Sequence, residues 1–387
     1  MPDGRDAISV KTISSIHDVN AAEWDACAGE TNPFVRHAFL AALENSKSVG
    51  NNTGWLPQHL VIDAPQEGLA ACAPLYVKGN SYGEYVFDWA WADAYQRAGG
   101  QYYPKLLCAA PFTPATGPRL LVRPDAKEPE ALKKALAGAM VQFAEQIGAS
   151  SVHLNFLEKP DWETLGEMGF LLRTGHQYHW ENDEYGEFDD FLSALSSRKR
   201  KAIKKERRET TEHGIELKTL TGSDIEERHW DAFFRFYIDT SSRKWGEPYL
   251  TREFFLNVGE TMADQAVMVA AERDGETVAA ALNFAGSDTL YGRYWGCTED
   301  FRFLHFEACY YRAIDYAIEQ GLKRVEAGAQ GEHKIQRGYL PTHTYSAHWI
   351  FDPNFKRAVD RFLTEERRSI DQDIGYLMSA SPFKKQE

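Results

Sequence analysis

Residues that could carry out acyl transfer gather in a short turn near the end of the chain. Gly331 is followed by Glu332, His333 and Lys334, and Arg337 comes three residues later. Moving an acyl group from an ester or thioester to an amine needs a proton acceptor and a positive partner for the oxyanion. Glu332 or His333 could take the proton, and Lys334 or Arg337 could bind the oxyanion or a phosphate. The alternative is an exposed loop of mixed charge.

A second group of candidates combines aromatic rings with charges. Arg243, with Trp245 and Tyr249 close by, could hold a phosphate while the rings stack on a base or sugar. An exposed loop beside a packed Trp is equally compatible with this pattern. A cluster that could line a cleft for the acceptor, or belong to the core, comprises Asp88, Trp89, Trp91, Asp93, Tyr95, Tyr102 and Tyr103.

A strongly basic segment stands out in an acidic chain. Residues 198–208 (RKRKAIKKERR) hold eight basic residues and one acid, whereas the whole chain carries a net charge of −14. The overall charge argues against general nucleic-acid binding, because phosphates are repelled by an acidic surface. The segment predicts a helix that could bind an anion, such as a phosphate backbone, through Lys201, Lys204, Lys205 and Arg208. A solvated charged face or a set of inter-domain salt bridges remains open.

Several other chemistries have no support in the sequence. The five cysteines are scattered and form no Cys-x-x-Cys pair, so neither a metal site nor a disulfide framework is indicated. Walker and Rossmann fingerprints are missing, and residues 96–101 only approach the glycine-rich loop of acetyl-CoA enzymes. The chain has no run of about 18 apolar residues, and its first ten residues lack an apolar signal core. We therefore expect a cytoplasmic protein without a membrane span.

The elements that must position these residues occur twice along the chain. Each set contains a β-hairpin, an aromatic-rich strand, a helix that ends at a glycine, a further strand and a His-Trp pair. The first set comprises residues 58–77, 82–91, 129–146 with Gly148, 152–157 and 179–180. The second set comprises residues 266–284, 290–295, 307–320 with Gly321, 324–329 and 348–349. The repetition predicts an internal duplication.

The length fits this duplication, because 387 residues exceed one ordinary core and suit two domains. We expect an N-terminal domain over residues 1–182 and a C-terminal domain over residues 183–387, the latter including the basic helix 198–208. Hairpin, strand, helix and strand in this order predict a mixed α/β fold, with a twisted sheet flanked by helices in each half.

Three segments resemble the FemAB-like family of aminoacyl transferases, whose halves have the GNAT-like acyltransferase fold. They are residues 32–44, residues 197–208 leading to 239–250, and residues 326–341. Residues 82–120 look like a hallmark of bacterial FemAB-like proteins. Where the family has a lysine in its Phe-Lys-x-Gly-Phe element, this chain has Gln336, flanked by Lys334 and Arg337. The resemblance implies tandem GNAT-like halves and transfer of an acyl group to an amine.

We therefore expect an acyltransferase that moves an aminoacyl or acyl group onto an amine, with a link to cell-wall peptides. Its donor would be aminoacyl-tRNA or acyl-CoA, its acceptor a small molecule or peptide, and no cofactor would stay permanently bound. The alternatives are an acetyl-CoA-dependent N-acetyltransferase and a non-catalytic protein that binds a peptide or cell-wall ligand. GNAT-like folds need no dedicated nucleophile, because backbone N–H groups at splayed strands stabilise the oxyanion.

Overall fold

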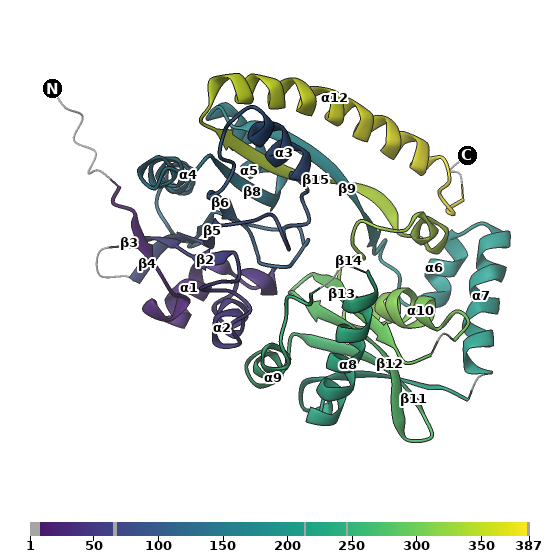
Figure 1. The fold of residues 1–387 in the computed structure, drawn as a ribbon. Helices are drawn as coiled ribbons and strands as arrows, with labels where there is room; N and C mark the ends of the chain where they lie inside the picture. Colours follow the sequence, from purple (N-terminus) through teal and green to yellow (C-terminus); the bar gives the residue numbers. More distant parts are fainter. Residues whose placement is uncertain (1–7, 65–67, 213, 245–246, 300, 385–387) are drawn as a thin grey trace. The chain divides into compact units, whose positions relative to one another are not determined.

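The computed structural model describes residues 8–64, 68–212, 214–244, 247–299 and 301–384 (Figure 1). The chain divides into two compact units. Unit 1 comprises residues 1–174 and 344–368, and unit 2 comprises residues 175–343 and 369–387. These units differ from the expected ranges of 1–182 and 183–387, because residues 344–368 return to the first unit. Strand pairing that joins Tyr345 to Leu157 and Ile350 to Ser151 explains this return. Such long-range pairing leaves no local sequence signal.

Unit 1 contains two sheets. The first is antiparallel in the order β1-β3-β4-β7, with β1 (Lys11–Ile13), β3 (His59–Ala64), β4 (Gly68–Ala73) and β7 (Leu121–Val122). The second runs in the order β15-β8-β6-β5-β2, with β2 (Trp55–Pro57), β5 (Leu75–Lys78), β6 (Lys105–Cys108), β8 (Ser151–Leu157) and β15 (Leu340–Ile350). Strands β6 and β8 are parallel, and a helical crossover connects them.

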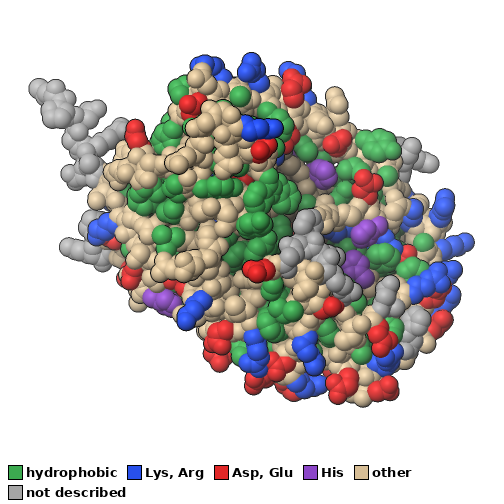
Figure 2. Space-filling view, in the orientation of Figure 1, with side chains coloured by type: hydrophobic (Ala, Val, Ile, Leu, Met, Phe, Trp, Pro, Cys, Tyr) green, Lys and Arg blue, Asp and Glu red, His purple; other side chains and the backbone are tan. Residues whose placement is uncertain are grey.

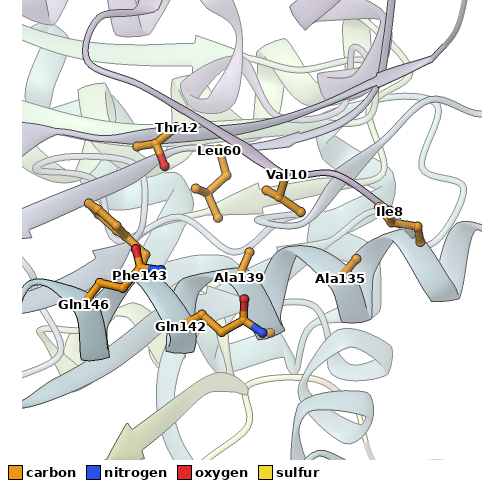
Figure 3. A pocket seen from close by; sticks show the side chains of 10 residues that line it. Ile8, Val10, Thr12, Leu60, Ala135, Ala139, Gln142, Phe143 and Gln146 are labelled. Atoms are coloured by element: carbon orange, nitrogen blue, oxygen red, sulfur yellow. The ribbon is translucent and has the colours of Figure 1, made fainter. Parts of the chain in front are cut away.

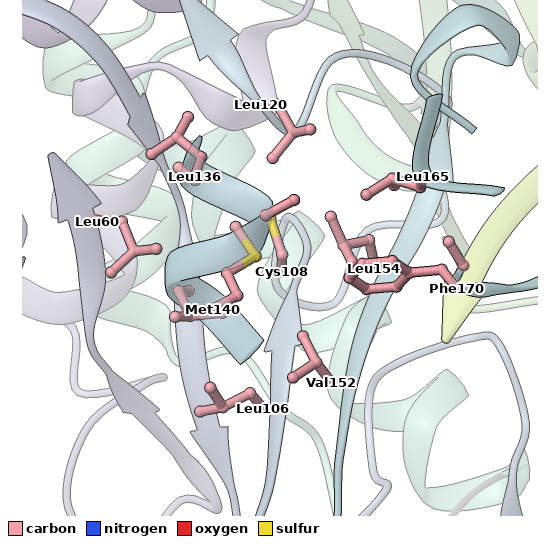
Figure 4. Close-up of a cluster of buried hydrophobic side chains, with 14 of the residues drawn as sticks. Leu60, Leu106, Cys108, Leu120, Leu136, Met140, Val152, Leu154, Leu165 and Phe170 are labelled. Atoms are coloured by element: carbon pink, nitrogen blue, oxygen red, sulfur yellow. The ribbon is translucent and has the colours of Figure 1, made fainter. Parts of the chain in front are cut away.

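The helices of unit 1 supply its core. They are α1 (Ala21–Ala28), α2 (His37–Asn45), α3 (Trp89–Arg97), α4 (Pro129–Gln146) and α5 (Lys159–Glu167), with short turns η1 (Ile16–Asp18) and η2 (Pro33–Val35). Helix α12 (Pro353–Met378) runs on into unit 2. Helix α4 has the predicted bounds and directs Leu136 and Met140 against the strands (Figure 4). Its apolar spacing therefore identified a core helix correctly.

One predicted element of unit 1 is wrong. Residues 82–91 form irregular chain and the start of α3, not a strand. Aromatic residues favour strands in general. Here Trp91, Ala92 and Tyr95 instead share one face of a helix, where they pack in a cluster with Leu363. Tertiary packing has overridden the local preference for a strand.

Unit 2 has a mixed sheet in the order β10-β11-β12-β13-β14-β9. Its strands are β9 (Leu171–Glu181), β10 (Glu216–Thr221), β11 (Ala266–Arg273), β12 (Glu276–Ala285), β13 (Thr289–Cys297) and β14 (Arg324–Glu326). The predicted hairpin of β11 and β12 is confirmed, and its turn residues Asp274 and Gly275 have φ of 53° and 83°. Positive φ at both positions suits an Asp-Gly turn. Strands β13 and β14 are parallel, so the predicted mixed α/β class is confirmed.

The helices of unit 2 lie before, between and after these strands. They are α6 (Phe188–Ala194), α7 (Ser197–Thr211), α8 (Glu227–Lys244), α9 (Arg252–Thr261), α10 (Leu304–Phe306) and α11 (Arg312–Glu319), with the short turns η3 (Gly222–Asp224) and η5 (Glu332–Arg337). A π-helical turn, η4 (Glu307–Tyr311), separates α10 from α11. Among the described residues, no helix combines the length and apolar character that crossing a membrane requires.

Candidate active site

The candidate site of unit 2 begins where two parallel strands separate. Strands β13 and β14 pair as far as Tyr291 and Glu326. The chain after β14 then follows β9, since Ala327 N donates to Tyr178 O at 3.0 Å and Tyr178 N donates to Gly328 O at 3.1 Å. Strand β13 continues to its own end at Cys297. The turn η5, which contains the predicted catalytic residues, comes directly after this separation.

Lys334 is one of three buried residues of that turn, with 5% of its surface exposed. Its Nζ donates to the carbonyl of Ala327 and, at 3.3 Å, to that of Gly328, and it lies 5.7 Å from the Tyr178 ring. No carboxylate pairs with it among the described residues. Burial therefore lowers the pKa of Lys334 to about 8. The alternative of an exposed loop therefore does not hold at this residue.

The two residues before Lys334 face outward. Glu332 and His333 are both exposed, and the Nε2 of His333 lies 3.0 Å from the Tyr310 hydroxyl. Partial burial lowers the pKa of His333, and the positive charges of Arg337 and Lys334 lower it further. His333 is therefore neutral near pH 7 and able to accept a proton.

Arg337 is tied into the protein rather than directed to solvent. Its NH2 group lies 2.9 Å from both carboxylate oxygens of Glu206, and its NH1 donates to the His333 carbonyl at 2.8 Å. The guanidinium carbon lies 3.4 Å from the centre of the Phe306 ring. These contacts identify Arg337 as an anchor of the turn.

Buried polar residues on β9 and β14 also belong to this region, and the sequence reasoning did not select them. His179 Nε2 lies 3.4 Å from Gln177 Oε1 and 3.9 Å from Glu326 Oε1, and all three residues are buried. Burial lowers the pKa of His179 to about 3, helped by the charges of Arg324 and Lys334. The alternation of Gln177 and His179 with buried aromatic residues in β9 is the signal that could have found them.

In unit 1, the predicted acidic and aromatic cluster has a buried part. Lys105 Nζ donates to Asp88, to Glu84 Oε2 at 2.8 Å and to Ser81 Oγ at 2.9 Å. The Tyr102 hydroxyl donates to Asp88 at 2.7 Å. Burial favours neutral Asp88, but the Lys105 ammonium and other partners outweigh it and lower the pKa of Asp88 to about 2. The carboxylates of Glu84 and Asp88 in turn raise the pKa of Lys105 against the effect of its burial.

Other members of the cluster are more accessible. Trp89 is 41% exposed, and its ring lies 4.9 Å from that of Tyr82 in an edge contact. Tyr103 is half-buried, with its hydroxyl 2.8 Å from Ser81 Oγ. The structure therefore brings Asp88 and Tyr102 together in a buried network and leaves Trp89 at the surface.

Ser81 stands in a Gly-x-Ser-x-Gly pattern over residues 79–83, the sequence form of a nucleophile elbow. Such an elbow joins a strand directly to a helix and exposes the serine. Here residues 79–88 are irregular and Ser81 is only 3% exposed. Lys105 stays protonated between two carboxylates, so it cannot take a proton from the hydroxyl. The pattern carries no nucleophile.

The basic helix was predicted correctly as α7. The side chains of its tRNA-binding candidates are exposed, namely Lys201, Lys204, Lys205 and Arg208. Figure 2 shows Lys and Arg side chains gathered with acidic ones at the right edge, where Figure 1 labels α7. Lys204 lies 3.0 Å from Asp189, so local carboxylates partly offset this positive charge. The remaining candidates, the Arg243 side chain and Trp245, lie outside the described residues.

A cavity of about 340 Å³ lies elsewhere, in unit 1, between α4 and the chain around β1 (Figure 3). Apolar side chains such as Val10, Leu60 and Phe143 line it together with the polar residues Thr12, Gln142 and Gln146. None of the candidate catalytic or binding residues lines it, so its position gives no support to a catalytic role.

Comparison with known proteins identifies relatives of the whole chain. The model of a family, FemAB-like, described as peptidoglycan biosynthesis/recognition, matches residues 15–385. No curated protein matches. Among solved structures, a FemX crystal structure is similar at 12% identity and a TM-score of 0.57, covering 88% of this chain and 98% of that chain.

Two further solved structures resemble the chain. One is the C-terminal domain of a putative lysylphosphatidylglycerol synthetase from Agrobacterium fabrum, at 9% identity and a TM-score of 0.56, covering 90% of this chain and 97% of that one. The other is L-PGS from Bacillus licheniformis, at 12% identity and a TM-score of 0.52, covering 86% and 98%. At such identities the likeness concerns the fold.

Proposed function

The chain belongs to the FemAB-like family of peptidoglycan biosynthesis and recognition, and from this premise we propose that it is an acyltransferase. The proposed reaction moves an aminoacyl or acyl group from an activated ester or thioester onto an amine. The donor is aminoacyl-tRNA or acyl-CoA, and the acceptor is a small molecule or peptide connected with the cell wall. No permanently bound cofactor takes part.

The observation that carries the proposal is the buried ammonium of Lys334, which no carboxylate neutralises among the described residues. Attack of an amine on an ester or thioester creates a tetrahedral intermediate with a negatively charged oxygen. Two N–H groups of Lys334 are directed to carbonyls, and the third remains to donate to that oxygen. A cation without a carboxylate partner in a water-poor site stabilises such a charge strongly.

Proton transfer is assigned to the exposed residues of the same turn. His333 is neutral near pH 7 because its pKa is lowered, so its imidazole accepts a proton from the attacking amine. Its Nε2 faces the Tyr310 hydroxyl, which leaves Nδ1 for the amine. Glu332, exposed beside it, passes the proton on to water.

The remaining candidates are assigned to binding. The exposed cations of α7 attract the phosphates of a tRNA donor, which makes that interaction sensitive to salt. Within unit 1, Trp89 offers an exposed ring for stacking on a ligand, and Asp88, Tyr102 and Tyr103 belong to a polar network around Lys105 and Ser81. In this proposal Arg337 serves binding indirectly, by holding the turn.

A donor competition experiment tests the proposal. The full chain is incubated with a pool of charged tRNA or with acetyl-CoA, and with amine-bearing muramyl peptides, and products are identified by mass spectrometry. Transfer from charged tRNA, absent for Lys334→Met, supports aminoacyl transfer. Transfer from acetyl-CoA alone identifies an N-acetyltransferase. Binding of the peptides without any transfer contradicts the enzyme and supports a recognition protein.

A further inference from the structure

We propose that Glu206 of α7 is a positioning residue, which holds the turn η5 so that the Lys334 ammonium keeps its buried place. The inference rests on the function proposed for Lys334, but it concerns a different residue on a different element. Glu206 is the single acid among eight basic residues in 198–208, and its carboxylate pairs with Arg337 of η5.

The helix α7 has two faces, and Glu206 lies on the inner one. Ile203 and Thr210 are buried and Arg207 is half-buried, so positions 203, 206, 207 and 210 form one stripe of the helix. The tRNA-binding candidates at 201, 204, 205 and 208 lie on the other side. The carboxylate therefore points toward the rest of unit 2, away from the exposed cations.

Glu206 reaches the turn through one guanidinium. Both its oxygens lie 2.9 Å from the NH2 group of Arg337, whose NH1 donates to the backbone carbonyl of His333 at 2.8 Å. Charge-assisted bonds to both oxygens fix the direction of the guanidinium as well as its distance. Because the His333 carbonyl belongs to the peptide unit before Lys334, this contact fixes the backbone at the proposed catalytic residue.

The π-helical turn η4 supports the same arrangement. The hydroxyl of Tyr311 donates to Glu206, and the hydroxyl of the preceding residue, Tyr310, contacts His333. π-turns occur often at functional sites, because the extra residue redirects side chains. Arg207 adds a second connection from α7 through Glu307 at 2.9 Å and Asp315 at 2.6 Å. Two consecutive residues of α7 thus hold both the turn and the helix behind it.

The test compares Glu206→Gln with Glu209→Gln in the full chain. Glu209 is a matched control, since it lies on the same helix and pairs with Lys205 at 3.4 Å and Arg302 at 3.2 Å, outside η5. The pKa of Lys334 is measured from the carbon-13 shift of its Cε, assigned through Lys334→Arg. If the turn loosens and water reaches the ammonium, Glu206→Gln raises this pKa by about one unit or more. Glu209→Gln leaves it near 8.

A milder variant tests the same proposal if Glu206→Gln fails to fold. Tyr311→Phe removes one hydrogen bond to Glu206 and should shift the Lys334 pKa in the same direction by less. We also expect Glu206→Gln to lower kcat without changing KM. Glu206→Gln with reduced stability but an unaltered Lys334 pKa overturns the proposal, because Glu206 is then merely structural. An active Lys334→Met would instead refute the proposed function and leave the pKa result standing.

Discussion

Two of the buried lysines, Lys105 of unit 1 and Lys334 of unit 2, show how differently the same residue type can be used. Lys105 in unit 1 is fully buried between Glu84 and Asp88, and its pKa is raised. Lys334 in unit 2 is nearly as buried, but its hydrogen-bond partners among the described residues are backbone carbonyls, and its pKa is lowered to about 8. The first charge is neutralised by the protein. The second is left, in our proposal, to bind the oxyanion of the tetrahedral intermediate.

The largest expected difference is in stability on removal of Lys105. Lys105→Met leaves Asp88 buried without its ammonium partner, while Glu84 keeps Lys78 at 3.8 Å. Removal of one partner from a buried pair costs about 3–5 kcal/mol. Urea unfolding at pH 7 measures the change. The triple variant Lys105→Met, Glu84→Gln and Asp88→Asn should recover part of it. If Lys105→Met is as stable as the parent, the proposed difference between Lys105 and Lys334 in their contribution to stability is wrong.

Removal of Lys334 is expected to change the stability in the opposite direction. The interval from 10.5 to about 8 corresponds to about 3 kcal/mol of cost for keeping this ammonium protonated in the fold. This cost is present below pH 8 and disappears as the pH rises through 10.5, where the unfolded chain also loses the proton. Lys334→Met should therefore be at least as stable as the parent at pH 7. Any advantage in stability over the parent should be lost at pH 10. Strong destabilisation at pH 7 would show that Lys334 is a structural residue like Lys105.

The exposed face of α7 should matter for donor binding and not for folding. Changing Lys201, Lys204, Lys205 and Arg208 to Ala should weaken binding of tRNA, because these cations no longer attract its phosphates. The dependence of log K on log salt should flatten by about one for each cation that bound a phosphate. Filter binding at several salt concentrations measures both. If the tRNA affinity and its salt dependence are unchanged, the exposed face of α7 does not bind tRNA. Only the inner face of the helix then has a role, in holding η5.

A smaller effect is expected at His333. Its lowered pKa places the acid limb of the pH–rate profile below 6.5, because the protonated ring cannot accept the amine proton. His333→Gln should remove this limb and reduce the rate, whereas Glu332→Gln should leave the limb in place. An acid limb that persists in His333→Gln would assign the proton acceptor elsewhere.

The sequence located the turn at Gly331–Gly338 but not the environment of its residues. Glycines and mixed charges are local signals, so the turn and the helices α4 and α7 could be predicted. The burial of Lys334 depends on the Tyr178 ring, which belongs to a strand far earlier in the chain. Likewise, only the fold shows that Glu206 faces inward from a basic helix.

In unit 1, too, the sequence did not show the environment of the candidate residues. Asp88 and Tyr102 were correctly grouped, but Lys105, which binds Asp88, was not included because a lone lysine in an apolar strand gives no functional signal. Aromatic residues around Trp89 indicated a strand, and packing made them a helix. Local patterns predicted the hairpin of β11 and β12 and the helices α4 and α7, and pairing between distant segments decided how the strands are arranged.

The most direct test of the account is the rate of acyl transfer by Lys334 variants under saturating donor. Removal of one oxyanion-stabilising donor typically costs about 10²–10³-fold in kcat, so Lys334→Met should lose activity to that extent while remaining folded. Lys334→Arg should retain more activity and move the alkaline limb, expected near pH 8 in the parent, to higher pH. A Lys334→Met enzyme with parental kcat and the same alkaline limb would contradict the central claim.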